Sequence, residues 1–229
     1  MTAPAEDILV GDLVAEFLQQ IGVSTTFGVI SIHNIPMLDA IGRRNAIRFI
    51  MARGEAGGGH MADAYARVSG ELGVLFTSTG PGAANAAGAL VEARFAGTPM
   101  LHLTGQTATP NMDLGQGAVH DVPDQLGMLR SVSKAAYRVR SPATALGTLV
   151  KAASEAMTPP MGPVSIEIPI DIQRTKIPRP AELATLMLET PIPDAGSDAS
   201  LDEIVARLKS AKRPLLWTGN GAKFAGAAV

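Results

Sequence analysis

Between residues 8 and 170, short apolar runs bounded by Gly, Pro or polar residues alternate with stretches in which apolar residues recur every three or four positions. A run of about five apolar residues is typical of a strand buried on both faces, and the other spacing is typical of an amphipathic helix. Their alternation predicts right-handed crossovers and an α/β fold, a parallel sheet with helices on both faces. The predicted strands are residues 25–29, 47–51, 73–77, 100–104 and 164–168, and the predicted helices are residues 8–21, 36–42, 55–68, 83–95, 123–130 and 142–157.

Proline becomes frequent after Ile170, and the stretch that follows ends in a run of Asp, Ala, Gly and Ser at residues 194–200. Such a composition is typical of an extended linker. We therefore expect a first domain at residues 1–175, a linker at residues 176–199 and the beginning of a second α/β domain at residues 200–229.

In the expected second domain, Ser200 is predicted to cap a helix over residues 201–209, and residues 214–218 are predicted to form a strand. A lone helix and strand cannot bury a core of their own. We therefore expect the polypeptide to continue beyond Val229.

Composition narrows the class of partner. The formal net charge is −2 and the 19 basic residues are scattered, which disfavours nucleic acid and anionic membranes and favours a small-molecule substrate. The absence of cysteine excludes disulfides, thiolate catalysis and cysteine-based zinc sites, and it fits a reducing compartment. Glu6 and Asp7 are unlike a signal peptide, and no apolar run approaches the ~20 residues that span a bilayer. We expect a cytoplasmic protein.

Glu55 is the most informative candidate for chemistry. Ligands of open parallel sheets bind beyond the carboxyl ends of the strands, and Glu55 follows a predicted strand closely. It precedes Ala56 and the glycines at residues 57–59, which offer no polar shielding and let a flat ligand approach. A poorly hydrated carboxylate there would suit proton sharing with a heteroaromatic nitrogen. The alternative is an acid that only complements the helix dipole.

Gly80, Pro81 and Gly82 form a second candidate, a compact turn at the start of a predicted helix that continues to Asn85. Backbone N–H groups at such a turn can face an anion or a planar ring. The turn lacks the third glycine of the dinucleotide fingerprint and the lysine of a P-loop, which disfavours a nicotinamide-binding or nucleotide-phosphate site. A merely tight connection between strand and helix remains the alternative.

The four histidines fit no metal-binding motif, so no metal ligand is predicted. His60 and His102 fall within a predicted helix and a predicted strand, which favours structural roles. His33 and His120 fall in predicted loops and are candidates for proton transfer near neutral pH.

Taken together, these segments resemble the acetolactate synthase and benzaldehyde lyase branch of thiamine-diphosphate-dependent enzymes. The resemblance implies the pyrimidine-binding N-terminal domain. It implies that Glu55 hydrogen-bonds the pyrimidine N1′ and promotes the imino tautomer, which deprotonates the thiazolium C2 to the ylid. It also implies that Gly80, Pro81, Gly82 and Asn85 line or support the pyrimidine pocket. The matching segments are Phe27-Gly28-Val29, Arg53-Gly54-Glu55 through His60 to Ala64-Tyr65-Ala66-Arg67, Thr79-Gly80-Pro81-Gly82-Ala83-Ala84-Asn85, Pro99 to Gly105, and Gly162-Pro163-Val164 to Ile168-Pro169.

The same resemblance implies a homo-dimer or tetramer with its active site between subunits. Mg²⁺ and the diphosphate would be held by a further domain through a Gly-Asp-Gly…Asn motif, and no Gly-Asp-Gly occurs here. The chain alone is therefore expected to be inactive. FAD is a possible additional cofactor in such enzymes.

Two departures bear on the substrate. Ile30-Ser31 stands where many relatives have Pro-Gly, so the loop after the first strand is rebuilt. His33 matches an active-site histidine of benzaldehyde lyase, and His120 lies near an active-site glutamine, which makes both candidates for the substrate pocket. The resemblance implies a lyase or carboligase acting on 2-oxo acids, 2-hydroxy ketones or aldehydes. A 2-oxo acid decarboxylase and a catalytically incomplete interaction domain are the alternatives.

Overall fold

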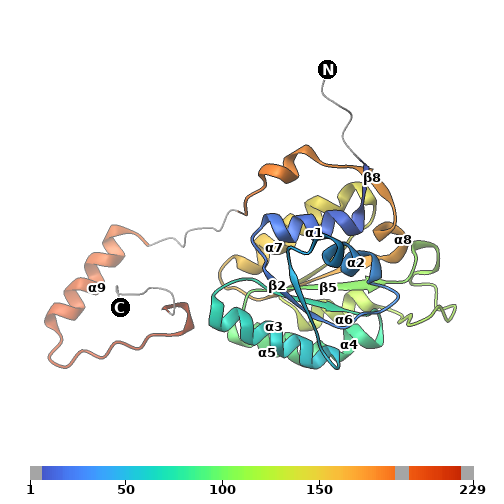
Figure 1. Ribbon diagram of the computed structural model, residues 1–229. Helices are drawn as coiled ribbons and strands as arrows, with labels where there is room; N and C mark the ends of the chain where they lie inside the picture. The colour runs from blue at the N-terminus through green and yellow to red at the C-terminus, as the bar shows by residue number, and fades with distance from the viewer. Residues whose placement is uncertain (1–6, 189–195, 223–229) are drawn as a thin grey trace, which may run out of the picture. The chain divides into compact units, whose positions relative to one another are not determined.

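The computed structural model describes residues 7–188 and 196–222. The chain divides into two compact units, Met1–Thr190 and Pro191–Val229. Within the described part of the first unit, six parallel strands form one sheet with helices on both faces, which confirms the predicted α/β class (Figure 1).

The strand order is β3-β2-β4-β5-β7-β6, so the chain moves from β2 outward to β3 and then returns to the other side of β2. This reversal creates a topological switch point between β2 and β4, where open α/β sheets bind ligands at the carboxyl ends of the strands. All residues of β4, β5 and β7 are buried, as the apolar runs predict. The strands are β2 (Thr25–Gly28), β3 (Arg48–Met51), β4 (Gly73–Thr77), β5 (Met100–Gln106), β6 (Ala135–Arg138) and β7 (Pro163–Pro169).

Each face of the sheet has its own apolar core. Leu75 and Phe76, adjacent in β4, belong to different cores because successive side chains of a strand point to opposite faces. Phe76 belongs to the same core as residues of α1 (Val10–Gln20), α2 (Ile35–Arg44) and α7 (Ala145–Met157). These three helices cover that face of the sheet (Figure 1). The opposite face is covered by α3 (Glu55–Ser69), α4 (Pro81–Asn85), α5 (Ala87–Ala96) and α6 (Gln125–Val132).

Several elements differ from the sequence prediction. Edge strand β6 was missed because its sequence, Ala-Ala-Tyr-Arg, is not an apolar run. The helix predicted over residues 83–95 is divided into α4 and α5 at Ala86. The first helix begins at Val10, because the preceding β1 (Asp7–Leu9) pairs antiparallel with β8 (Lys176–Pro178).

The first unit also extends beyond the expected domain end at residue 175. Besides β8, the segment contains the 3₁₀ helix η3 (Ala181–Thr185), whose Leu183 is buried in the core. Part of the predicted linker therefore packs on the first unit, and its residues 189–195 lie outside the described residues. The remaining short elements are α8 (Ile170–Gln173), η1 (Thr109–Asn111) and η2 (Pro142–Thr144).

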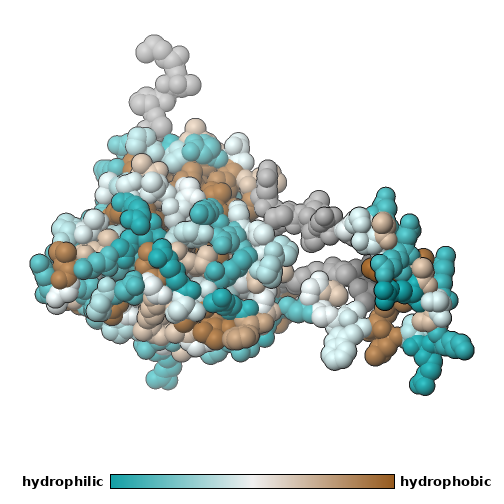
Figure 2. All heavy atoms as spheres, turned by 180° about the vertical axis from the view of Figure 1, so that it is seen from behind, coloured by the Kyte–Doolittle hydropathy of each residue, from teal (hydrophilic) through white to brown (hydrophobic). Residues whose placement is uncertain are grey.

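The second unit contains α9 (Asp198–Ser210), which is capped by Ser197 and not by Ser200 as predicted: the Ser197 hydroxyl accepts from Ser200 N at 3.3 Å. A 3₁₀ helix, η4 (Asn220–Ala222), follows. The strand predicted at residues 214–218 is not formed, because a strand needs a hydrogen-bonded neighbour and no described residue pairs with this segment. Apolar side chains on this unit remain exposed (Figure 2), namely Leu201, Ile204, Val205, Leu208, Leu215, Leu216 and Trp217.

None of the helices in residues 7–188 and 196–222 has both the length and the hydropathy needed to span a membrane.

Candidate functional site

The loops after β2 and β4 meet at the switch point and are tied together by side chains. Ser31 donates from Oγ to Ser78 Oγ at 2.8 Å. Asn34 donates from Nδ2 to Val29 O at 2.9 Å and to Thr77 O at 3.0 Å. Ser31 therefore fastens the loop after β2 to Ser78, directly after the end of β4.

Glu55 is the first residue of α3 and lies at this edge. Its side chain is only 8% exposed, and its Oε2 accepts a hydrogen bond from Asn85 Nδ2 at 3.3 Å. Its Oε1 lies 2.7 Å from the position that a Cβ on Gly82 would occupy. The predicted helix start at Glu55 is confirmed, and the structure places it beside the Gly80–Gly82 turn.

The glycines that follow Glu55 serve different purposes. A Cβ on Gly59 would come within 2.6 Å of Ala89 Cβ, and one on Gly58 within 3.2 Å of Leu75. Both glycines let α3 pack closely on α5 and the sheet. Only Gly57 faces open space, since a Cβ there would meet nothing within 4 Å. The interpretation that these glycines open the site to a flat ligand is therefore wrong for Gly58 and Gly59, and it stays a prediction for Gly57.

The turn at Gly80 is held by protein contacts. Gly80 has φ +55° and ψ −111°, and a Cβ there would come within 2.0 Å of His120 O. Gly80 N–H donates to Gln125 Oε1 at 2.6 Å and Gly82 N–H to Thr79 O at 3.1 Å. Because these two N–H groups are used internally and Pro81 has none, the turn is poorly suited to anion binding. A planar ring is the better match of the two predicted ligands.

His33 and His120 come together as neighbours, with ring centroids 5.5 Å apart. His33 is buried, and its Nδ1 has no hydrogen-bond partner among the described residues. Burial, and then the neighbouring His120, lower the pKa of His33. The His33 carbonyl lies against Gly105, where a Cβ would come within 2.3 Å of it. Since His120 O also contacts Gly80, this histidine pair borders the same turn as Glu55.

His60 and His102 stand apart from this pair. His60 is exposed on α3. His102 is fully buried, where its Nε2 bonds Thr77 Oγ1 at 2.8 Å and its Nδ1 bonds Ser165 Oγ at 2.9 Å. Burial lowers the pKa of His102 to about 3, so its ring stays neutral. These contacts support the structural role expected for His102.

The sequence prediction missed a buried polar network beside the turn. Glu167 on β7 is completely buried, and burial raises its pKa against the opposing effect of Arg138, its ion-pair partner. Gln106 and Gln125 also donate to its Oε2, at 3.3 and 3.0 Å. The available signal was the acidic residue in the middle of the apolar run at residues 164–168.

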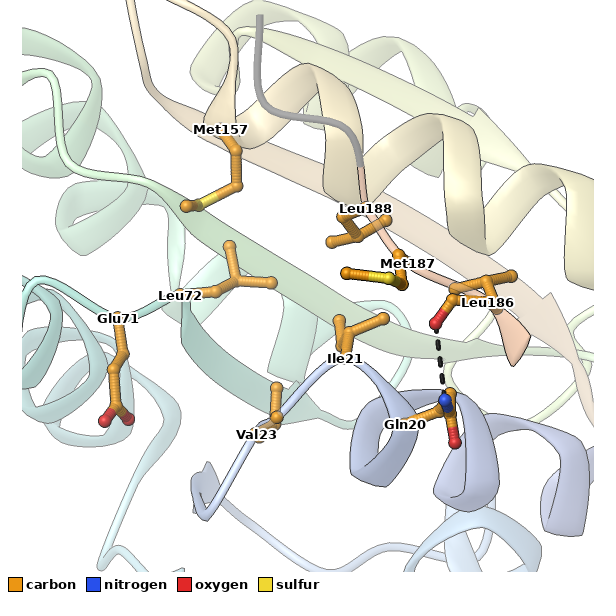
Figure 3. A pocket seen from close by; sticks show the side chains of 10 residues that line it. Gln20, Ile21, Val23, Glu71, Leu72, Met157, Leu186, Met187 and Leu188 are labelled. Carbon is orange, nitrogen blue, oxygen red and sulfur yellow. Dashed lines mark hydrogen bonds between the residues drawn. The ribbon is translucent and has the colours of Figure 1, made fainter. Parts of the chain in front are cut away.

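A cavity of about 480 Å³ lies at the opposite, amino end of the sheet, beside residues that precede β2 and β4 (Figure 3). Ile21, Leu72 and Leu188 converge on it, and Gln20 Nε2 donates to Leu186 O at 3.3 Å. Its lining is mainly apolar, which fits the packing of residues 186–188 and not catalysis. Within the described residues, no group of three His, Asp or Glu side chains is placed to hold a metal ion.

Comparison with known families matches residues 8–128 to the thiamine pyrophosphate enzymes, N-terminal TPP binding domain. The match covers Glu55, the Gly80–Gly82 turn, both loop histidines and Gln125. The chain belongs to this family of thiamine-pyrophosphate-dependent enzymes, and this unit is their N-terminal cofactor-binding domain.

Curated relatives have several activities. The acetolactate synthase large subunit of Lactococcus lactis subsp. lactis is 29% identical over 93% of this chain, and the acetolactate synthase of Arthrospira platensis is 34% identical over 92%. A probable 2-ketoarginine decarboxylase of Pseudomonas aeruginosa is 29% identical over 99%. The chain spans 37–40% of the length of these three proteins.

A solved structure confirms the fold. The thiamine diphosphate-dependent 4-hydroxybenzoylformate decarboxylase of Rhodococcus jostii RHA1 superposes with a TM-score of 0.83 over 94% of this chain and 40% of that chain. Its sequence is 24% identical, so the likeness concerns the fold alone.

Proposed function

We propose that Glu55 shares a proton with N1′ of the aminopyrimidine of thiamine diphosphate, in an enzyme that cleaves or forms a bond next to a carbonyl carbon. When bound, the cofactor supplies a thiazolium carbon that attacks carbonyl groups. The observation that carries the proposal is the buried carboxylate of Glu55, which has no cationic partner among the described residues.

The surroundings of Glu55 fit an aminopyrimidine. A carboxylate has about four lone-pair positions, and Asn85 is the one described side chain that donates to it. A buried acid left with so few partners is costly, and a ring nitrogen that shares its proton offsets that cost. Gly82, in the turn, lies directly against Glu55 Oε1, and Asn85 donates to Oε2, so both residues border the carboxylate. We assign Gly80, Pro81, Gly82 and Asn85 to the pyrimidine pocket on this basis.

The alternative for Glu55 is an acid that only complements the dipole of α3. Such an acid gains about 0.3–1 kcal/mol at an exposed helix start and needs no burial. Glu55 is only 8% exposed, which is more burial than that role requires. The burial therefore favours the cofactor.

For the reaction, we propose a carbon–carbon bond lyase or carboligase acting on 2-oxo acids, 2-hydroxy ketones or aldehydes. The acetolactate synthases among the relatives support it. The second candidate is a 2-oxo acid decarboxylase, which the probable 2-ketoarginine decarboxylase supports.

His33 and His120 are the proposed substrate-facing residues, because the unpartnered Nδ1 of His33 can exchange a proton with a ligand. Product analysis with pyruvate, benzoin and an added aldehyde distinguishes the two reactions.

We further propose that the cofactor is shared between chains of a homo-dimer or tetramer, with Mg²⁺ and the diphosphate held outside this unit. The exposed sides of α3 and α5 carry Met61, Val68 and Phe95, which are 44%, 89% and 87% exposed. Large exposed apolar side chains of this kind mark interaction surfaces when they cluster.

The test is Glu55→Gln in the enzyme that carries this chain together with a diphosphate-binding domain. The amide keeps the size of the side chain but cannot share the proton, so hydrogen–deuterium exchange at the cofactor C2 should slow by about 10²- to 10⁴-fold. Cofactor occupancy, measured by calorimetry, should be retained. Glu182→Gln, at an exposed position of η3, is the control. Exchange at the native rate with full occupancy would show that Glu55 is a helix-terminal acid only.

A further inference from the structure

Gln125, in the first turn of α6, is completely buried and uses the whole hydrogen-bonding capacity of its amide. Its Oε1 accepts from Thr79 Oγ1 at 2.7 Å and from Gly80 N at 2.6 Å. Its Nε2 donates to Gly105 O at 3.1 Å and to Glu167 Oε2 at 3.0 Å. One side chain therefore joins the carboxyl ends of β4, β5 and β7.

The orientation of this amide is set by Gly80 N–H, which only donates, and by Gly105 O and Glu167 Oε2, which accept. An ionised carboxylate only accepts hydrogen bonds, so the NH₂ end of Gln125 must face it and the carbonyl end must face Gly80. Arg138 pairs with Glu167 Oε1 and leaves Oε2 to Gln125 and Gln106. The ion pair keeps Glu167 available as an acceptor inside the protein.

The contact between Gln125 and Gly80 acts at a sensitive point of the backbone. Gly80 has a positive φ that other residues rarely adopt, and His120 O closes the space beside it. Two residues later, Gly82 lies against Glu55 Oε1. A shift of Gly80 would therefore also move Gly82, which lies against the Glu55 carboxylate.

We propose that Gln125 is a positioning residue that holds the Gly80–Gly82 turn against Glu55, with the Glu167–Arg138 ion pair anchoring the NH₂ end of its amide. The consequence for the cofactor rests on the proposed function of Glu55. The positioning of the Gly80–Gly82 turn by Gln125 depends only on contacts within this chain.

The variants are designed around the direction of the hydrogen bonds. In Gln125→Glu, the new carboxylate still accepts from Thr79 and Gly80, but it has no hydrogen for Glu167 or Gly105 and meets the like charge of Glu167. Adding Glu167→Gln places an amide donor at position 167 opposite the carboxylate acceptor at position 125. The double variant also has the same net charge as the native protein. Gln125→Met removes all four bonds at similar size. Gln116→Glu makes the same chemical change at an exposed position.

The first measurement is amide hydrogen exchange of the chain without cofactor, in peptides covering residues 79–85. Gln125→Glu and Gln125→Met should raise exchange at Gly80 and Gly82 by about tenfold or more, because a protecting acceptor is lost or displaced. The double variant should approach the native rate, and Gln116→Glu should match it. Native protection in both single variants, or a double variant no better protected than Gln125→Glu, would overturn the proposal.

The second measurement is C2 exchange of cofactor bound to the longer enzyme, at confirmed occupancy. Gln125→Glu should slow it and Glu167→Gln should rescue it, which loss of packing volume alone would not produce. Native C2 exchange in the single variants would refute the link to Glu55. Should Gln125→Glu fail to fold, Gln125→Met is measured in the same two ways. If Glu55→Gln leaves C2 exchange unchanged, the proposed function fails, and the exchange of Gly80 and Gly82 still decides the positioning role.

Discussion

The carboxylate of Glu55 and the backbone of Gly82 meet so closely that Oε1 lies 2.7 Å from where a Cβ on Gly82 would stand. Ser78 Cβ would lie 2.6 Å from the same point. The starts of α3 and α4 therefore meet at a position where only a hydrogen atom fits. This contact joins the proposed acid to the proposed pocket wall.

Gly82→Ala should consequently destabilise the protein and displace Glu55. The new methyl group has to move the Glu55 carboxylate or the Ser78 backbone, which costs about 1–3 kcal/mol as overpacking. Urea unfolding gives the loss. Gly88→Ala in α5 is the control, because a Cβ there meets nothing within 4 Å and should be neutral or stabilising. Equal effects of the two substitutions would contradict the close contact.

His102 should make folding sensitive to acid. Its pKa is lowered to about 3 in the folded chain and returns to about 6.5 on unfolding. The neutral ring of His102 makes its full contribution to the free energy of unfolding above about pH 6.5. This contribution is lost as the pH falls toward 3, at up to about 1.4 kcal/mol per pH unit. The free energy of unfolding should thus drop by about 2 kcal/mol from this group between pH 6.5 and pH 5.

His102→Gln keeps hydrogen-bonding atoms near Thr77 and Ser165 but does not titrate. Its unfolding free energy should depend less steeply on pH in this window, whereas the exposed His60→Gln should follow the native curve. His33, whose pKa is also lowered, contributes to the slope common to all three proteins. Parallel curves for His102→Gln and the native protein would rule out the assignment.

The coupling between His33 and His120 can be measured directly. Burial is the larger cause of the lowered pKa of His33 and the charge of His120 is the smaller one. His120→Gln removes the second cause, so the pKa of His33 should rise toward its ordinary value while staying below it. NMR titration of the imidazole protons reports the change, with His60→Gln as control. An unchanged His33 titration would mean that the rings, although 5.5 Å apart, do not interact.

Residues 1–229 by themselves should bind thiamine diphosphate weakly, with or without Mg²⁺. The sequence contains no Gly-Asp-Gly, and the described residues offer no cluster of metal ligands. Hydrogen bonds to an aminopyrimidine alone leave the diphosphate charge uncompensated. Calorimetry is the measurement, and tight binding that requires Mg²⁺ would show that this unit holds the whole cofactor.

The sequence by itself determined the layers of the fold. Strands buried on both faces need continuous apolar runs, and the helices need a three- to four-residue apolar period, so both are legible along the chain. Five of the six sheet strands were predicted in this way, and β6 was missed because an edge strand can be less apolar. Glu55 and the Gly80–Gly82 turn were also chosen as site candidates from sequence, since both follow strand ends and match a known family.

Only the tertiary structure showed what holds that turn in place. Gln125, Glu167 and Arg138 lie far from Gly80 in sequence, and no periodicity relates them to it. They meet because the order of the strands brings the carboxyl ends of β4, β5 and β7 together. Likewise, residues 214–218 have strand-like composition but no strand, since pairing depends on a neighbouring backbone and none of the described residues supplies it. Local patterns report which side chains are buried, whereas hydrogen-bond partners are chosen by the three-dimensional arrangement.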